Sequence, residues 1–195
     1  MRLISKLVAL GVLSVAVMGL ASQPVHAGLL PTKVTIAPES GNFRWTYAVI
    51  MTSETLMKTG DFFTIYDFNG LVPGSATSLD PNFAFSSSLT GNTPARVLPN
   101  DDPSVPNLTW TYTGPNLTGQ QGLGNFSAVS IYDYSVDGNF TASSARTFDG
   151  KINVNITDTS VPTPAPPIPE PATIALVGMG IPLLGLRRWM RRKRS

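Results

Sequence analysis

The sequence predicts an all-β protein, with an antiparallel β-sandwich or jelly-roll-like domain flanked by an N-terminal signal peptide and a C-terminal transmembrane helix. Three observations support this prediction. Residues 28–160 contain several runs in which apolar and polar residues alternate, which is typical of half-buried strands. Pairs rich in glycine, asparagine and proline separate these runs and predict turns. An uncharged apolar segment lies near each end of the chain.

Residues 1–27 have the three parts of a secretory signal peptide. A short basic region precedes an apolar core at residues 7–20, and the VHA segment that ends at Ala27 has small residues where signal peptidase binds. We expect cleavage between Ala27 and Gly28, with cleavage after Ala21 as the alternative. The other interpretation is an uncleaved membrane anchor, although a span needs about 20 apolar residues and this core is shorter.

The signal peptide contains the only histidine, His26, and the chain has no cysteine. After cleavage the protein would therefore lack both residue types. This excludes Ser-His-Asp and Cys-His nucleophiles within one chain, and also the common zinc sites. We expect a non-enzymatic protein with no catalytic residues, no metal and no cofactor.

Three segments alternate most clearly and predict strands, at residues 43–51, 108–113 and 151–157. Less regular strands are expected at 62–68 and 126–134, and weaker ones at 34–36, 82–89 and 139–148. These segments amount to about seven or eight strands. A domain of about 130 residues can bury the core of a sandwich built from them.

The segments between the strands carry turn chemistry. The best hairpin candidate is Asp137-Gly138-Asn139, which follows the β-forming residues 131–136. Residues 94–106 contain four prolines and predict a long surface loop. Only residues 53–59 (SETLMKT) resemble a helix.

Residues 28–160 carry six basic and eleven acidic residues, a net charge of −5, so we expect no nucleic-acid binding. The densest acidic positions are Asp101-Asp102, and Asp133 with Asp137. Oxygen-rich loops can bind Ca²⁺, but no segment has the spacing of a calcium loop, and aspartates also favour turns. We prefer the turn interpretation over the calcium one. A pair of carboxylates could also hydrolyse glycosides without histidine.

Two strands carry aromatic residues at alternate positions, so that Trp45 shares a face with Tyr47, and Trp110 with Tyr112. Such rows usually face the core. If exposed, Trp45 and Trp110 are the candidates for stacking on sugar rings.

The C-terminal part has three segments. Residues 161–171 (VPTPAPPIPEP) contain six prolines and predict an extended linker. Residues 172–195 predict a transmembrane helix with a basic end. Its charge-free part, 172–186, would measure about 22 Å as a helix, against a hydrocarbon core of about 30 Å, and is a marginal span. The basic cluster should stay cytoplasmic; it comprises Arg187, Arg188, Arg191, Arg192, Lys193 and Arg194.

This tail resembles a PEP-CTERM protein-sorting signal, in which Pro-Glu-Pro precedes a short apolar helix and an arginine-rich end. The matching residues are Pro169, Glu170 and Pro171, and Ile168 occupies the hydrophobic position before them. The resemblance implies recognition by an exosortase, a membrane-embedded enzyme similar to a cysteine transpeptidase. It also implies cleavage near the motif in a largely Gram-negative group of bacteria. The released domain would then reach the cell surface or the exopolysaccharide matrix.

Together these features predict an exported, non-enzymatic envelope or exopolysaccharide-associated protein, first membrane-anchored with a cytoplasmic C-terminus. The expected partners are the export machinery with signal peptidase, an exosortase-type enzyme, the membrane and exopolysaccharide. One alternative is a carbohydrate-binding module of the extracellular matrix. The second alternative is a small carboxylate-dependent enzyme that acts on glycosides.

Overall fold

The computed structural model describes residues 28–167, and the predicted signal peptide, sorting motif and transmembrane helix lie outside these residues. Within them the chain is all-β and every paired strand is antiparallel, as the sequence predicts. Residues 28–167 contain no helix with the length and apolar character that a membrane crossing needs.

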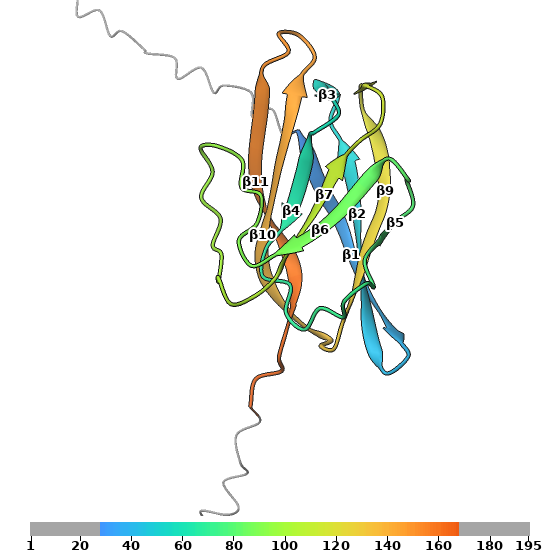
Figure 1. Cartoon of the computed structure of the whole chain (residues 1–195), viewed down its shortest axis with the longest axis vertical. Coiled ribbons are helices and arrows are strands. Elements are labelled where there is room, and N and C mark those ends of the chain that lie inside the picture. The colour runs from blue at the N-terminus through green and yellow to red at the C-terminus, as the bar shows by residue number, and fades with distance from the viewer. Residues whose placement is uncertain (1–27, 168–195) are drawn as a thin grey trace, which may run out of the picture.

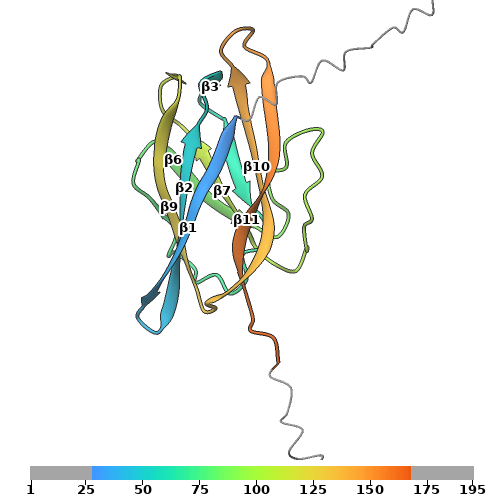
Figure 2. The same cartoon turned by 180° about the vertical axis from the view of Figure 1, so that it is seen from behind.

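The strands form two sheets that pack face to face as a sandwich (Figures 1 and 2). The first sheet has the order β1-β2-β9-β5, with β1 (Leu29–Glu39), β2 (Asn42–Met51), β5 (Thr77–Ser78) and β9 (Gln121–Ser130). The second has the order β6-β7-β4-β10-β3-β8, and β11 pairs with β10. Its strands are β3 (Thr55–Met57), β4 (Phe62–Ile65), β6 (Phe83–Ser88), β7 (Asn107–Tyr112), β8 (Leu117–Thr118), β10 (Tyr134–Arg146) and β11 (Ile152–Thr163).

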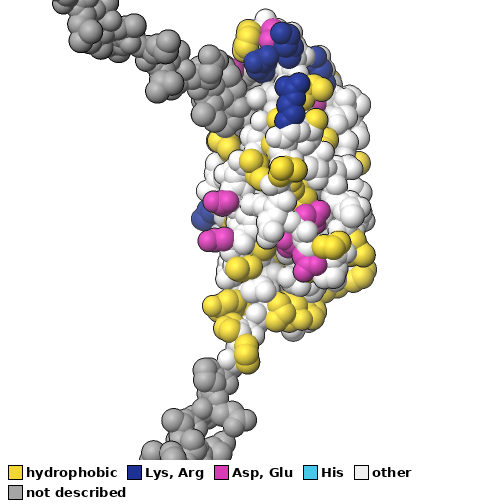
Figure 3. Space-filling view, turned by 90° about the vertical axis from the view of Figure 1, so that its left-hand side faces the viewer, with side chains coloured by type: hydrophobic (Ala, Val, Ile, Leu, Met, Phe, Trp, Pro, Cys, Tyr) yellow, Lys and Arg dark blue, Asp and Glu magenta, His cyan; other side chains and the backbone are white. Residues whose placement is uncertain are grey.

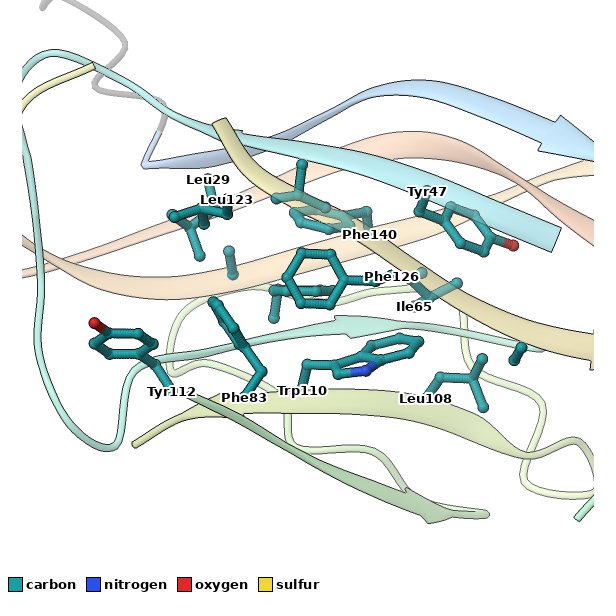
Figure 4. Close-up of a cluster of buried hydrophobic side chains, with 14 of the residues drawn as sticks. Leu29, Tyr47, Ile65, Phe83, Leu108, Trp110, Tyr112, Leu123, Phe126 and Phe140 are labelled. Atoms are coloured by element: carbon teal, nitrogen blue, oxygen red, sulfur yellow. The ribbon is translucent and has the colours of Figure 1, made fainter. Parts of the chain in front are cut away.

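Aromatic side chains from both sheets form the centre of the core (Figure 4). Phe126 projects from β9 onto a group of rings that belong to the second sheet. Its ring meets those of Phe63 and Phe83 edge-on at 4.7 Å, and that of Trp110 at 5.6 Å. Phe63 also stacks on Phe140 at 5.3 Å. Such pairs contribute about 0.5–1.5 kcal/mol each beyond the burial of their area.

A long loop covers the outer face of the second sheet. Thr64 and Thr109 face outward from β4 and β7, yet both are buried and their hydroxyls lie 2.9 Å apart. The hydroxyls of Thr64 and Tyr66 both donate to the carbonyl of Asn92, at 2.9 and 3.2 Å. Residues 94–106 contain no strand or helix and form the predicted loop, and Asn92 just before it contacts the outer face of the sheet.

The predicted hairpin at Asp137-Gly138-Asn139 is wrong. These residues lie inside β10, where they pair with Ser160, Thr159 and Asp158 of β11. Gly138 has a packing role here, since a Cβ atom would lie 2.7 Å from a methyl group of Val161. The turns lie elsewhere, at residues 131–133 before β10 and at 147–151 before β11, where Gly150 has a φ of +67°.

Three further predictions need correction. Residues 53–59 contain no helical turn but strand β3, because Leu56 pairs with both β10 and β8 and this pairing outweighs the local helix propensity. The proline-rich linker also begins later than residue 161, since Val161 is buried and β11 pairs as far as Thr163. Residues 28–167 contain eleven strands rather than seven or eight, because β3, β5 and β8 are too short to show periodicity.

We predict that Gly138→Ala lowers the free energy of unfolding by about 1–3 kcal/mol, because the new methyl group overpacks the core beside Val161. Denaturant titration of the purified protein measures the effect. Gly122→Ala is the matched control, because this strand glycine has no atom within 4 Å of the added Cβ position. In a Val161→Ala background the cost of Gly138→Ala should shrink, and an equal cost in both backgrounds would contradict the steric explanation.

Candidate functional site

A cleft of about 450 Å³ lies where the long loop meets β10 and β11. Its polar lining consists of carboxylates from Asp67, Asp102, Asp137 and Asp158 and amides from Asn69, Asn100 and Asn139. We call it the acidic cleft. Figure 3 shows carboxylates gathered in the lower half of this face. The cleft is rich in hydrogen-bond acceptors, and the sequence alone did not identify it because its residues come from four separate segments.

Two of these carboxylates hold the loop in place. Asp67 follows β4 with a φ of +57°, and its Oδ1 accepts a hydrogen bond from the amide of Asp102 at 2.8 Å. Asp102 Oδ1 accepts from the amide and the hydroxyl of Ser104, at 2.9 and 2.7 Å. Neighbouring Asp101 accepts from Asn107 Nδ2 at 2.8 Å. These bonds agree with the predicted turn role of Asp101 and Asp102.

The environment moves the pKa values of Asp67 and Asp102 in opposite directions. Burial raises the pKa of Asp67; the amide of Asp102 opposes this, and the charges of Asp101 and Asp102 add to it. Hydrogen bonds from Ser104 lower the pKa of Asp102. Glycosidases use a pair of carboxylic acids of which one has a raised pKa and the other a lowered pKa. Here both groups already accept main-chain hydrogen bonds that fix the loop, which weakens the case for catalysis.

Asp137 and Asp158 are the carboxylates that remain open to a ligand. They lie on neighbouring strands, and no hydrogen bond or ion pair joins either carboxylate to another described residue. Both also line a second cleft of about 360 Å³ beside β1, together with Lys33. Among residues 28–167, no group of three or more acidic, histidine or cysteine side chains is placed to hold a metal ion.

The structure contradicts the sugar-stacking role considered for Trp45 and Trp110. Both side chains are completely buried. Trp45 Nε1 donates to the carbonyl of Tyr132 at 3.0 Å, and the ring of Trp110 stacks on Phe63 at 5.4 Å. The alternation in β2 and β7 places these rings in the core, so neither is available to a sugar.

Gly28 is the first described residue and is part of the fold. Its carbonyl accepts hydrogen bonds from the amide of Thr52 and the hydroxyl of Thr55, both at 3.1 Å. A side chain here would collide with Ser144 Oγ. Gly28, which follows the predicted cleavage site, is therefore held by the fold, while Ala27 lies outside the described residues.

At the C-terminal end of the domain, residues 164–167 connect β11 to the predicted sorting tail. Residues 167–194 are a PEP-CTERM protein-sorting motif. The match includes Ile168, Pro169-Glu170-Pro171 and the basic cluster, and it confirms the resemblance found in the sequence. The motif implies export, membrane anchoring and processing by an exosortase. No curated protein matches the chain.

We predict that Asp67→Asn makes stability less dependent on pH. The folded protein raises the pKa of Asp67, so the protonated form stabilises the fold, and this contribution is lost as pH rises through the folded pKa. The decline in stability just above the ordinary pKa of 3.8 should therefore be smaller in the variant than in the parent.

Urea titrations at a series of pH values test this. Asp102→Asn is the matched control, and its effect should have the opposite sign. The folded protein lowers the pKa of Asp102, so the ionised carboxylate stabilises the fold above the ordinary pKa of 3.8, and this contribution is lost on acidification. Parallel pH profiles for the parent and Asp67→Asn would contradict the role assigned to burial.

Proposed function

We propose that this chain is a non-enzymatic protein of the cell envelope or exopolysaccharide matrix, delivered there by export and by processing of its sorting tail. The observation that carries the proposal is the PEP-CTERM motif at residues 167–194, which follows directly after a closed β domain. The host would be a bacterium of the Gram-negative type, and the domain would be extracytoplasmic.

The end of the domain is suited to such processing. Thr163 is the last paired residue, opposite Tyr134 in β10. Residues 164–167 have no regular structure and are exposed, and three of them are prolines. An enzyme that cleaves near Pro169-Glu170-Pro171 could therefore bind an extended peptide without opening the sandwich.

The non-enzymatic role is supported by side-chain chemistry. The domain has no cysteine, and its sequence from Gly28 onward contains no histidine. Asp67 and Asp102, whose pKa values shift in opposite directions, both accept hydrogen bonds that hold the loop. Covalent and general-base chemistry through the usual side chains has little basis here.

We predict that the mature wild-type protein ends near Pro169-Glu170-Pro171, and that changing all three residues to alanine leaves the chain membrane-bound and ending in Ser195. Mass spectrometry of the C-terminal peptide and membrane fractionation measure both outcomes. Pro164→Ala, in the same linker but outside the motif, is the control and should be processed normally. A released wild-type protein that still ends in Ser195 would overturn the processing proposal.

Carbohydrate binding is the second candidate function, now at the acidic cleft rather than at the tryptophans. The cleft has room for one or two sugar units, and Asp137 and Asp158 are free to accept hydrogen bonds from hydroxyl groups. Asn69 and Asn100 add amides that can both donate and accept.

Under this second candidate, we predict that Asp137→Ala with Asp158→Ala weakens binding to matrix polysaccharide at least about tenfold, because two charge-assisted hydrogen bonds are lost. Glycan arrays followed by calorimetry measure the affinity. Asp133→Ala is the control, since Asp133 is exposed and lies outside the cleft. Wild-type protein that binds no glycan, or a variant that binds unchanged, would remove the support for this function.

A further inference from the structure

The first half of strand β11 presents its apolar side to solvent. Ile152, Val154 and Ile156 lie at alternate positions on the outward face, where Ile152 is 76% and Ile156 42% exposed. The intervening asparagines face inward, and Asn155 Nδ2 donates to the carbonyl of Leu29 at 2.9 Å. This is the reverse of a half-buried strand, whose apolar side faces the core. An apolar row with this orientation indicates a surface that another molecule covers.

The ends of this row carry opposite charges (Figure 3). Arg96, Arg146 and Lys151 surround a depression of about 440 Å³ that also contains Ile152 and Val154. Arg146 already pairs with Asp149 at 2.7 Å, so Arg96 and Lys151 are the cations available to a partner. Beyond the other end of the row lie Asp158 and Asp137, with the rest of the acidic cleft. Basic, apolar and acidic parts therefore follow one another along one face.

This order of charges is complementary to itself. Lys151 and Asp158 lie about 23 Å apart along β11 at about 3.3 Å per residue, and their midpoint falls at Val154 and Asn155. A two-fold axis at Val154, within one residue of this midpoint, would place Ile152 of one copy on Ile156 of the other. It would also place each Lys151 within about one residue of the position opposite Asp158, so that each basic end lies on the acidic end of a second copy. Such an isologous contact closes with two molecules.

We propose that this chain pairs with a second copy of itself through the outward face of β11, with the two strands antiparallel. The apolar row provides the buried centre of the contact, and the two sets of opposite charges fix its orientation. Because β11 leads into the tail, the two tails leave from opposite ends of the pair. Copies anchored side by side in one membrane cannot meet in this way, so pairing follows release. That consequence rests on the proposed function, whereas the pairing itself does not.

The absence of cysteine makes disulfide cross-linking a clean test. In the full chain, solubilised in mild detergent, Val154→Cys should give a disulfide-linked dimer under mild oxidation, because the two copies of residue 154 meet at the axis. Leu79→Cys is the control: it is 77% exposed and lies away from β11, and should stay monomeric. Equal cross-linking of both variants, together with monomeric sedimentation of the wild type, would overturn the proposal.

A charge exchange tests the orientation. In the Val154→Cys background, Lys151→Glu and Asp158→Lys should each reduce cross-linking at least about tenfold, because each places like charges together. Mixing the two variants should restore cross-linking. In the mixed dimer the Lys151→Glu copy lies opposite the Asp158→Lys copy at one contact, and wild-type Asp158 lies opposite wild-type Lys151 at the other contact. A mixture that does not recover would exclude this pairing. Cross-linking that requires added polysaccharide would instead identify that polymer as the occupant of the face.

Discussion

The insertion of Phe126 between the rings of Phe63, Phe83 and Trp110 is the contact on which the sandwich depends. It is the point where the central strands of the two sheets meet, at ring separations of 4.7–5.6 Å. Burial of one such side chain contributes about 1.5–3 kcal/mol. The same contact sets the spacing of the sheets and so places the strands at the edge of the second sheet. Strand β10 belongs to this aromatic centre through Phe140, which stacks on Phe63, and β11 pairs with β10.

Strand β10 connects the strands over the aromatic core to the edge strand β11. It pairs with β4 and β3 on one side and with β11 on the other, and Gly138 lets Val161 of β11 approach closely. The loop that follows β4 is tied to the outer face through Asp67 and the amide of Asp102. The acidic cleft is thus formed by strand pairing and one tethered loop, with no mobile element required.

The C-terminal strand has two roles in the proposed function. It completes the fold as far as Thr163, and it then becomes the exposed peptide that leads to the sorting motif. Every strand of both sheets and every residue of the core cluster that the structure describes lies at or before Thr163. Alternation in the first half of β11 places Ile152, Val154 and Ile156 on the outward face, whereas Val161 near the end of the strand lies in the core.

The sequence by itself determined the all-β class, the buried rows of β2 and β7 and the sorting tail. These features depend on alternation within one strand or on a short motif, and both are local. Only the tertiary structure decided the strand role of residues 53–59, the packing role of Gly138 and the assembly of the acidic cleft. Asp67 and Asp102, or Gly138 and Val161, meet because strands and loops from distant parts of the chain pair. Local periodicity shows that one face of a strand is apolar, but the partner that faces it is set by packing across the whole fold.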